Sequence, residues 1–494
     1  MHPAGERHPE GSRSEAPGRS ARILPGPSPS PASEPVSVGR PRRRSWLLGL
    51  AFALAYIAFR NSPPMLAGYE ADVDAYLRWF NTIAASGLRN VYARSPFDYP
   101  PLYAYFLWVV AKGVAFLGRL GVPTPSGPML VRFWPIGFDL AIGGMLAWIG
   151  RAASRSAAAT AAPGKRPAPR WGWILPALYL LNPAVLFDTG YWGQTDSIHS
   201  AFVLAAFLAL GATRTGLLSA GAGDRLERGW PTWVAWVLLS LGGLMKPIAL
   251  PYFPLLLVLS IVWRGIRPTL VGMGAALITV VLFCLPFMRG GPWAFIEEIV
   301  KDFGSMPFTS CNAHNLWWIL GPWRPANEPW LFGVSATDVG YVLFGICLLA
   351  ILVKTWTIAW RRSPSLAEAL GLAAVLGVGF FLLSTHMHEN HLFTPIPLLL
   401  PLVVLPWANG PARTRTALWI LAGVSIGTFI NMMAHDPRIM SHWPWLEGPE
   451  MFENPALVPG VPRRVLAGCG TAINFGAAVG LFRLVFQRQR LGPE

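Results

Sequence analysis

Long apolar runs separated by short polar segments fill the chain from residue 45 onward. A helix needs about 20 apolar residues to cross the hydrocarbon core of a bilayer, and several runs are at or below that length. The pattern predicts an all-α polytopic membrane protein, a bundle of about 12 to 14 transmembrane helices. The thirteen runs are 45–60, 99–118, 130–150, 172–187, 198–213, 230–245, 248–263, 268–287, 335–357, 366–383, 391–408, 416–434 and 465–487.

The composition agrees with a membrane location. Of the 494 residues, 53% are hydrophobic and only 13% are charged, whereas soluble domains carry about 25% charged residues. A soluble enzyme of this size would need more charge to cover its surface. The 23 tryptophans suit aromatic belts at the lipid–water boundary. The four cysteines stand singly, which excludes a disulfide scaffold; they are Cys284, Cys311, Cys347 and Cys469.

The net charge of +15 does not indicate nucleic-acid binding, because most basic residues lie in the N-terminal tail or in short loops. Residues 1–44, rich in Pro, Ser, Gly and Arg, are expected to form a disordered cytoplasmic tail. Basic loops of membrane proteins stay in the cytoplasm. That rule places 151–170, 214–228, 264–267, 361–362, 413–415 and the C-terminus inside, and 188–197, 289–334, 384–391 and 435–464 outside.

The number of crossings is open. With the tail inside, thirteen crossings would leave the C-terminus outside, so either one early run does not cross or a span is missing from the set. The run 99–118 is the candidate for not crossing, because it begins at Pro100-Pro101.

Two outer segments, 61–98 and 289–334, are long and are expected to be structured. Between residues 72 and 87, apolar side chains recur at helical spacing, which predicts an amphipathic helix lying on the membrane surface. Residues 293–303 show the same pattern. The spaced apolar residues of the first helix are Val73, Tyr76, Leu77, Phe80 and Ile83.

Ionisable side chains gather on the predicted outer side. Such groups are costly at a membrane and therefore suggest function. Cations could hold a lipid phosphate there, and a carboxylate could take a proton from an acceptor hydroxyl. The residues are Asp72, Asp74, Asp98, Asp188, Asp196, Lys246, Arg289, His386, His388, Glu389 and His391.

Each of these positions also has a structural interpretation. Asp72 could cap the predicted surface helix, and Asp98 could be a turn or cap residue. Lys246 and Arg289 could be anchors that extend toward water at helix ends. Asp139 lies in the middle of a predicted span and is expected to pair internally.

A metal site has only weak support. The histidines His386, His388 and His391 lack the partner spacing of zinc sites. Asp72 and Asp74 form a short acidic pair of the kind that can hold Mg²⁺ or Mn²⁺. No cofactor is expected.

Four strings together resemble the GT-C superfamily of polyprenyl-phosphate-sugar-dependent glycosyltransferases, and most closely its Alg-type glucosyltransferases and their bacterial relatives. DVDAYLRW resembles that family's Asp-x-Glu-Ala-x-x-x-Trp, and DYPPLYAY is similar to its Asp-Tyr-Pro-Pro-Leu-Thr-Ala-Tyr. The others resemble its Phe-Pro-x-x-Arg-Gly with Asn-x-Trp, and its His-x-His-Glu-Lys. They stand at 72–79, at 98–105, at 286–290 with 315–317, and at 386–389.

The chain departs from the family pattern at Asp74, where the family has Glu, and at Asn390, where it has Lys. The string WGQTD at 192–196 looks more like bacterial mannosyltransferase-type members. These differences concern the sugar and the acceptor rather than the reaction class.

The resemblance implies an inverting hexosyltransferase in a bacterial inner membrane, with its site on the extracytoplasmic face. Asp72 would be the catalytic base. The donor would be a polyprenyl-phosphate sugar carrying glucose or mannose, and the acceptor would be lipid-linked or another extracytoplasmic hydroxyl. Residues 45–334 would form the catalytic transmembrane module and 335–494 a C-terminal one. The implied substrate-binding residues are Asp74, Asp98, Tyr99, Gln194, Asp196, Lys246, Arg289, His314, Asn315, His386, His388 and Glu389.

Three rivals stay open, and one of them is a non-catalytic membrane scaffold. A lipid flippase or solute transporter would usually show two matching halves, which the sequence does not display. A protein O-mannosyltransferase would use the same donor chemistry with another acceptor.

Overall fold

The computed structural model describes residues 43–159, 170–211, 231–288, 291, 293, 295–297, 307–405, 411–436 and 461–487. The chain divides into two compact units, residues 1–52 and 53–494. Helix α1 (Arg43–Arg60) runs across the boundary between them. Everything below concerns the second unit.

The described chain is almost entirely helical. Eight of its helices have the length and apolar composition to cross a bilayer, and four further apolar helices are shorter. An all-α polytopic membrane protein is thereby confirmed, while the number of 12 to 14 spans stays a prediction. The long helices are α5 (Pro101–Arg119), α6 (Gly127–Ala159), α11 (Tyr252–Arg264) with η3 (Pro247–Ala249), α12 (Ile266–Cys284) with η4 (Leu285–Phe287), α15 (Ala336–Arg361), α16 (Leu366–Leu383), α18 (Pro411–Met433) and α20 (Val461–Phe486). The shorter ones are α1, α7 (Trp171–Leu180), α9 (Asp196–Gly211) and α10 (Thr232–Met245).

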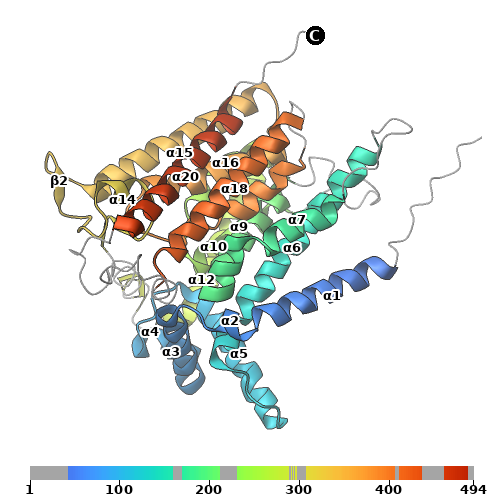
Figure 1. Cartoon of the computed structure of the whole chain (residues 1–494), viewed down its shortest axis with the longest axis vertical. Helices are drawn as coiled ribbons and strands as arrows, with labels where there is room; N and C mark the ends of the chain where they lie inside the picture. The colour runs from blue at the N-terminus through green and yellow to red at the C-terminus, as the bar shows by residue number, and fades with distance from the viewer. Residues whose placement is uncertain are drawn as a thin grey trace, which may run out of the picture. The chain divides into compact units, whose positions relative to one another are not determined.

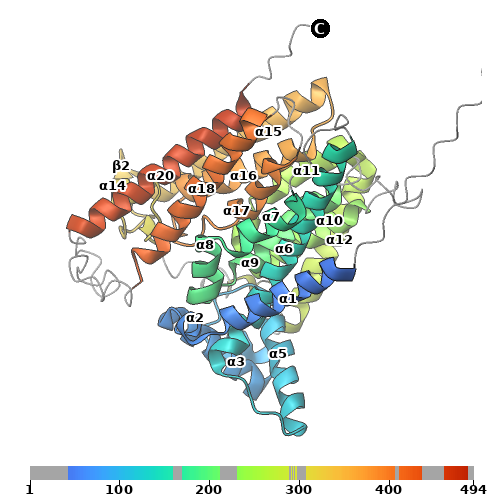
Figure 2. The same ribbon diagram turned by 45° about the vertical axis from the view of Figure 1, so that its right-hand side comes forward.

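Most of these helices run side by side in one bundle (Figures 1 and 2). Helix α16 lies inside it and is buried along nearly its whole length. Its small residues allow neighbouring helices to approach closely. The helix begins with a capping box, in which Ser365 and Glu368 satisfy each other's backbone N–H groups.

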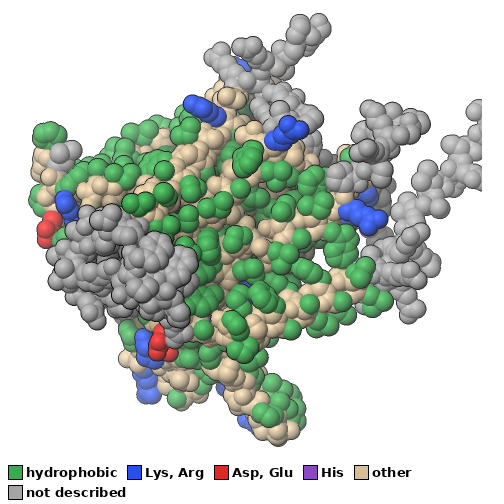
Figure 3. Space-filling model, viewed as in Figure 1, with side chains coloured by type: hydrophobic (Ala, Val, Ile, Leu, Met, Phe, Trp, Pro, Cys, Tyr) green, Lys and Arg blue, Asp and Glu red, His purple; other side chains and the backbone are tan. Residues whose placement is uncertain are grey.

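The outside of the bundle is apolar. Large hydrophobic side chains on α12 and α15 are more than half exposed, among them Leu270, Leu277, Tyr341 and Leu349. The face of the molecule in Figure 3 is also mostly hydrophobic, with few charged side chains. A continuous apolar surface of this extent is expected where lipid, rather than water, surrounds the helices.

Residues 61–98 fold as a layer of short helices at one end of the bundle. They form α2 (Pro63–Leu66), α3 (Glu70–Ser86), η1 (Leu88–Asn90) and α4 (Val91–Arg94). The predicted amphipathic helix is thus present as α3. Its apolar face packs on α5 and α6 of the protein instead of facing lipid, with Val73, Tyr76, Trp79, Phe80 and Ile83 buried. Of the helix expected at 293–303, residues 293 and 295–297 are described and helical, and the others lie outside the described residues.

The chain enters helix α5 beside one turn of α3 and comes back to the same turn through the loop that follows α5. At its start, the rings of Tyr103 and Tyr76 lie 5.5 Å apart. After the loop, Gly127 at the start of α6 lies so close to α3 that an added Cβ would be 2.8 Å from the side chain of Leu77. In Figures 1 and 2, α5 points across the direction of the bundle helices. The ends of a crossing helix lie about 30 Å apart, so this geometry favours the interpretation that the run 99–118 does not cross.

Two small sheets fix the outer loops in the described part of the chain. Strand β1 (Ser310–Cys311) pairs in parallel with β4 (Met387–His388), and β2 (Pro329–Leu331) forms a hairpin with β3 (Val334–Ser335). The first pairing holds the loop before α15 against the loop after α16. The remaining short elements are α8 (Pro183–Val185), η2 (Leu186–Trp192), α14 (Leu316–Leu320), α17 (Pro395–Leu399) and η5 (Leu400–Val403).

Candidate functional site

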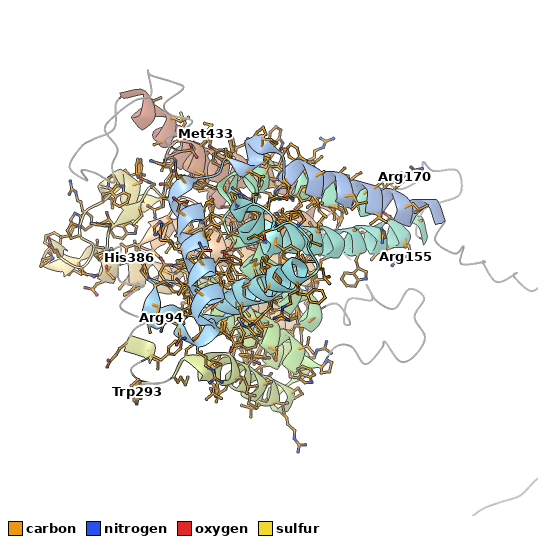
Figure 4. The ribbon with its side chains drawn as sticks, turned by 90° about the horizontal axis from the view of Figure 1, so that it is seen from below. Arg94, Arg155, Arg170, Trp293, His386 and Met433 are labelled. Carbon is orange, nitrogen blue, oxygen red and sulfur yellow. The ribbon has the colours of Figure 1, made fainter. Side chains whose placement is uncertain are left out.

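The predicted outer segments meet at one end of the bundle, where α3, the turn after η2, the end of α10 and the loop containing β4 come together. Figure 4 places Arg94 and His386 on one side of the view, and Arg155 and Arg170 on the other. The arginine-rich ends of α6 and α7 are therefore remote from this end.

Asp72 is the centre of the first group. It lies in the first turn of α3, whose N-cap is Tyr69, and no side chain caps that helix end. The interpretation of Asp72 as a cap is therefore wrong. Its Oδ2 atom accepts a 2.6 Å hydrogen bond from Nε2 of Gln194. Tyr76 donates its hydroxyl proton to Oε1 of Gln194 at 3.0 Å, which fixes the orientation of the amide.

The surroundings of Asp72 shift the pKa of its carboxyl group toward neutral pH. Burial raises the pKa of Asp72 to about 6, although the Lys246 ammonium and the Gln194 hydrogen bond pull it down. Asp98 and Asp196 raise it slightly further. The carboxyl group is therefore mostly ionised at neutral pH and near the range expected of a general base.

Lys246 and Asp196 form the second group. Lys246 Nζ lies 2.6 Å from Asp196 Oδ1, and Asn390 Nδ2 donates to Asp196 Oδ2, also at 2.6 Å. The ammonium lies 5.7 Å from the ring centre of Tyr99. Burial opposes the charge, but Asp196 outweighs it and raises the pKa of Lys246. Lys246 is buried and ion-paired, so its interpretation as a water-seeking anchor is wrong.

The loop around β4 contributes neutral histidines. The ring centres of His388 and His391 are 5.1 Å apart, and the backbone N–H of His388 donates a hydrogen bond to Nδ1 of His391. Burial lowers the pKa of His388 to about 4 and that of His391 well below its usual value. Burial also raises the pKa of Glu389 to about 8. At neutral pH these histidines can offer hydrogen bonds but no charge.

Several expected ligands lie at the edge of this site or are engaged elsewhere. Asp98 is exposed, and His386 is hydrogen-bonded to Thr385 in a left-handed backbone conformation. Asn315 caps α14 and donates to the carbonyl groups of Phe381 and Ser384, so its side chain holds α14 to the end of α16.

His314 belongs to a neighbouring group. Its Nε2 lies 3.0 Å from Nε2 of His435, and its backbone N–H donates to Asn431. Asn431 in turn donates to the carbonyl group of Glu389. His314 therefore reaches the loop around β4 through one intermediate side chain.

The acidic pair of Asp72 and Asp74, a weakly supported cation site, does not converge. Residues two positions apart on a helix face different directions, and Asp74 is exposed while Asp72 points toward Gln194. Within the described ranges, no three His, Cys, Asp or Glu side chains are grouped so that they could hold a metal ion. Arg289, a predicted phosphate ligand, lies outside the described residues.

Asp188 is a buried carboxyl group next to the site. Both its oxygens lack a hydrogen-bond partner within the described part of the chain. Burial, followed by the nearby Asp196, raises the pKa of Asp188 well above its usual value. Its raised pKa favours the neutral form of Asp188 beside the ion pair of Lys246 and Asp196.

Two buried arginines support the turn that carries Gln194, and sequence reasoning did not identify them. Arg60 pairs with Asp139 at 2.6 Å and donates to Thr189, which confirms that Asp139 pairs internally. Arg132 donates to the carbonyl groups of Gly190 and Tyr191 at 3.0 and 2.9 Å. An arginine in an apolar run is the signal that could have marked Arg132.

No protein-family model matches the chain, and neither does any curated protein sequence.

Proposed function

We propose that the protein is an inverting glycosyltransferase that moves a hexose from a polyprenyl-phosphate carrier to an acceptor hydroxyl. The observation that carries the proposal is the half-buried Asp72 carboxylate, oriented by Gln194 and electrostatically coupled to the buried ammonium of Lys246. A base of this kind beside a cation matches what transfer from a phosphate leaving group requires.

In the reaction, Asp72 takes the proton of the acceptor hydroxyl. The acceptor oxygen forms a bond to C1 of the sugar while the bond between C1 and the phosphate oxygen breaks. Attack from the face opposite the phosphate inverts the anomeric centre. The polyprenyl phosphate leaves as an anion and needs no proton, so the site needs only one general base.

Lys246 is suited to stabilise the charge that develops on the leaving phosphate. Charge stabilisation in a poorly solvated site is usually the largest catalytic contribution. Neutral His388 and His391 would donate hydrogen bonds, and an arriving phosphate would raise their affinity for protons. Arg289 stays a proposed ligand of the same phosphate.

The proposed site faces the extracytoplasmic side of a bacterial inner membrane. Support comes from the arginines at the opposite end of the bundle, since Arg155 and Arg170 are far from the site residues in Figure 4. The donor and the acceptor would then approach from the outer leaflet.

The test uses the purified protein in nanodiscs with a panel of polyprenyl-phosphate hexoses and mixed glycolipid acceptors. Sugar-dependent loss of donor is expected with the wild-type chain. Asp72→Asn should reduce the rate by about 10²–10⁴-fold without changing thermal unfolding. Asp74→Asn is the matched control, because Asp74 is on the same helix but exposed. A wild-type rate in Asp72→Asn, or uptake of free sugar or lipid without transfer, would contradict the proposal.

A further inference from the structure

The hairpin between β2 and β3 ends in an unusually exposed phenylalanine. Phe332 is 96% exposed, more than any other large hydrophobic side chain of the described residues. On either side of it, Trp330 and Val334 are 37% and 44% exposed. The hairpin therefore presents a fully exposed Phe332 ring between two partly exposed apolar side chains.

The backbone of this turn does not favour phenylalanine. Phe332 has φ of +52° and Gly333 has φ of +80°, and they form the two-residue loop between the paired Leu331 and Val334. Such turns prefer Asn-Gly or Asp-Gly, because both residues are left-handed. A bulky side chain is disfavoured at the first position. Neither packing nor backbone conformation within the described chain favours phenylalanine at position 332. We therefore expect the ring to contact something outside the chain.

The base of the hairpin is fixed. The ring of Trp330 lies 5.8 Å from that of Trp317, whose indole N–H donates to the carbonyl group of Leu383. Thr337 donates its hydroxyl proton to Asn327 at 2.7 Å. The exposed tip is therefore held at a defined place relative to the start of α15.

The exposed side chains of α15 indicate where a bilayer would begin and end along this helix. Tyr341 and Trp360 are 67% and 82% exposed, and exposed apolar residues lie between them. Nineteen residues of helix span about 28 Å, close to the hydrocarbon thickness of a bilayer. Aromatic residues commonly mark the two ends of that layer. We therefore expect the lipid boundary at Tyr341, about 7.5 Å of helix beyond Ala336.

We propose that the hairpin tip, formed by Trp330, Phe332 and Val334, inserts into the boundary between headgroups and acyl chains of the leaflet on the Asp72 side. The headgroup layer is about 5–8 Å deep, so a hairpin that joins α15 directly lies within it. Figures 1 and 3 show the hairpin projecting at the edge of the molecule beside α15.

The side of the membrane follows from the other small sheet. The same loop contains β1, which pairs with β4 next to the site histidines. The hairpin and the candidate site therefore share one end of the bundle. The inference does not depend on the proposed reaction, because it concerns only contact with lipid.

A fluorescent probe can measure the depth of the tip. Bimane is attached to Phe332→Cys in nanodiscs, with Cys347 and Cys469 replaced by Ala because they are the cysteines that are not buried. A nitroxide near the lipid carbonyl should quench this probe several-fold more than one at Glu328→Cys, an exposed position in the segment leading into the hairpin. Equal quenching at both sites, or stronger quenching of the Phe332 probe by aqueous iodide, overturns the proposal.

Lipid contact can also be tested in the wild-type chain. A phosphatidylcholine with a diazirine near its glycerol should form adducts within residues 329–334 in nanodiscs. Phe332→Asn, which suits the turn, should reduce them several-fold. Absence of adducts overturns the proposal. Adducts that form in nanodiscs but not in native membranes also overturn it, because they would assign the tip to a protein partner.

Discussion

The side-chain amide of Gln194 donates a 2.6 Å hydrogen bond to the carboxylate of Asp72. Because the amide oxygen of Gln194 accepts a hydrogen bond from the hydroxyl group of Tyr76, the NH₂ group must point toward Asp72. The bond joins α3 to the turn after η2. It also favours the ionised form of the carboxyl group, which is the form that a general base requires.

Removing this bond should shift the pH dependence of the proposed transfer. The Gln194 hydrogen bond lowers the pKa of Asp72, which stands at about 6. Gln194→Leu should therefore raise that pKa and move the acid limb of the rate profile to higher pH. Gln194→Glu should move it further, because a second carboxylate disfavours ionisation.

The measurement is the rate against pH under donor-limited conditions, which reports the free enzyme. DCCD modifies only protonated carboxyl groups. The reactivity of Asp72 with DCCD should therefore rank the Gln194 variants in the same order, without a measurement of sugar transfer. Asp74→Asn serves as the control. Identical acid limbs in the three Gln194 forms would show that this bond does not set the protonation of Asp72.

Breaking the Lys246–Asp196 pair should destabilise the protein strongly. Both side chains are buried, and removing one partner of such a pair costs about 3–5 kcal/mol. Lys246→Met leaves the Asp196 carboxylate uncompensated, whereas Lys246→Met with Asp196→Asn removes both charges. The double variant is expected to regain much of the lost stability.

Thermal unfolding in nanodiscs measures this difference. Lys112→Met is the matched control, since Lys112 is exposed on α5. If the single and double Lys246 variants unfold at the same temperature, the pair does not contribute through charge compensation.

The sequence predicted the elements that depend on periodicity and local motif better than those that depend on distant pairing. Helix α3 followed from apolar spacing, and Asp72 was selected as a candidate base from a local string. The pairing of Lys246 with Asp196 joins residues 50 positions apart, and nothing in either local string specifies it. Arg132 was missed for a different reason, because its partners are backbone carbonyl groups and no residue type signals those.

The contribution of Arg132 can be tested by removing its guanidinium group. It holds the carbonyl groups of Gly190 and Tyr191, and a Cβ on Gly193 would lie 3.2 Å from it. Arg132→Met leaves these carbonyl groups without their donor, at about 1–3 kcal/mol for each buried group. Lower unfolding temperature and a displaced Gln194 are expected.

Arg155→Met provides the comparison, because Arg155 is exposed near the far end of the same helix. Unfolding is followed by heating, and the position of Gln194 by whether Asp72 gains DCCD reactivity at neutral pH. If Arg132→Met behaves like Arg155→Met in both measurements, Arg132 does not support the turn that carries Gln194.

Glu389 should make the protein less stable as the pH rises. Burial raises its folded-state pKa from 4.5 to about 8. The unfolded chain therefore releases this proton at lower pH than the folded chain, so the stabilisation is complete below about pH 4.5 and is lost as the pH approaches 8. Asp72 adds a smaller loss of the same sign, because burial raises its pKa to about 6.

Glu389→Gln stays neutral and should flatten the fall in unfolding temperature between pH 5 and 8, whereas Glu328→Gln, at an exposed position, should not. Parallel curves for Glu389→Gln and the wild-type chain would mean that Glu389 is ionised in the folded protein at neutral pH.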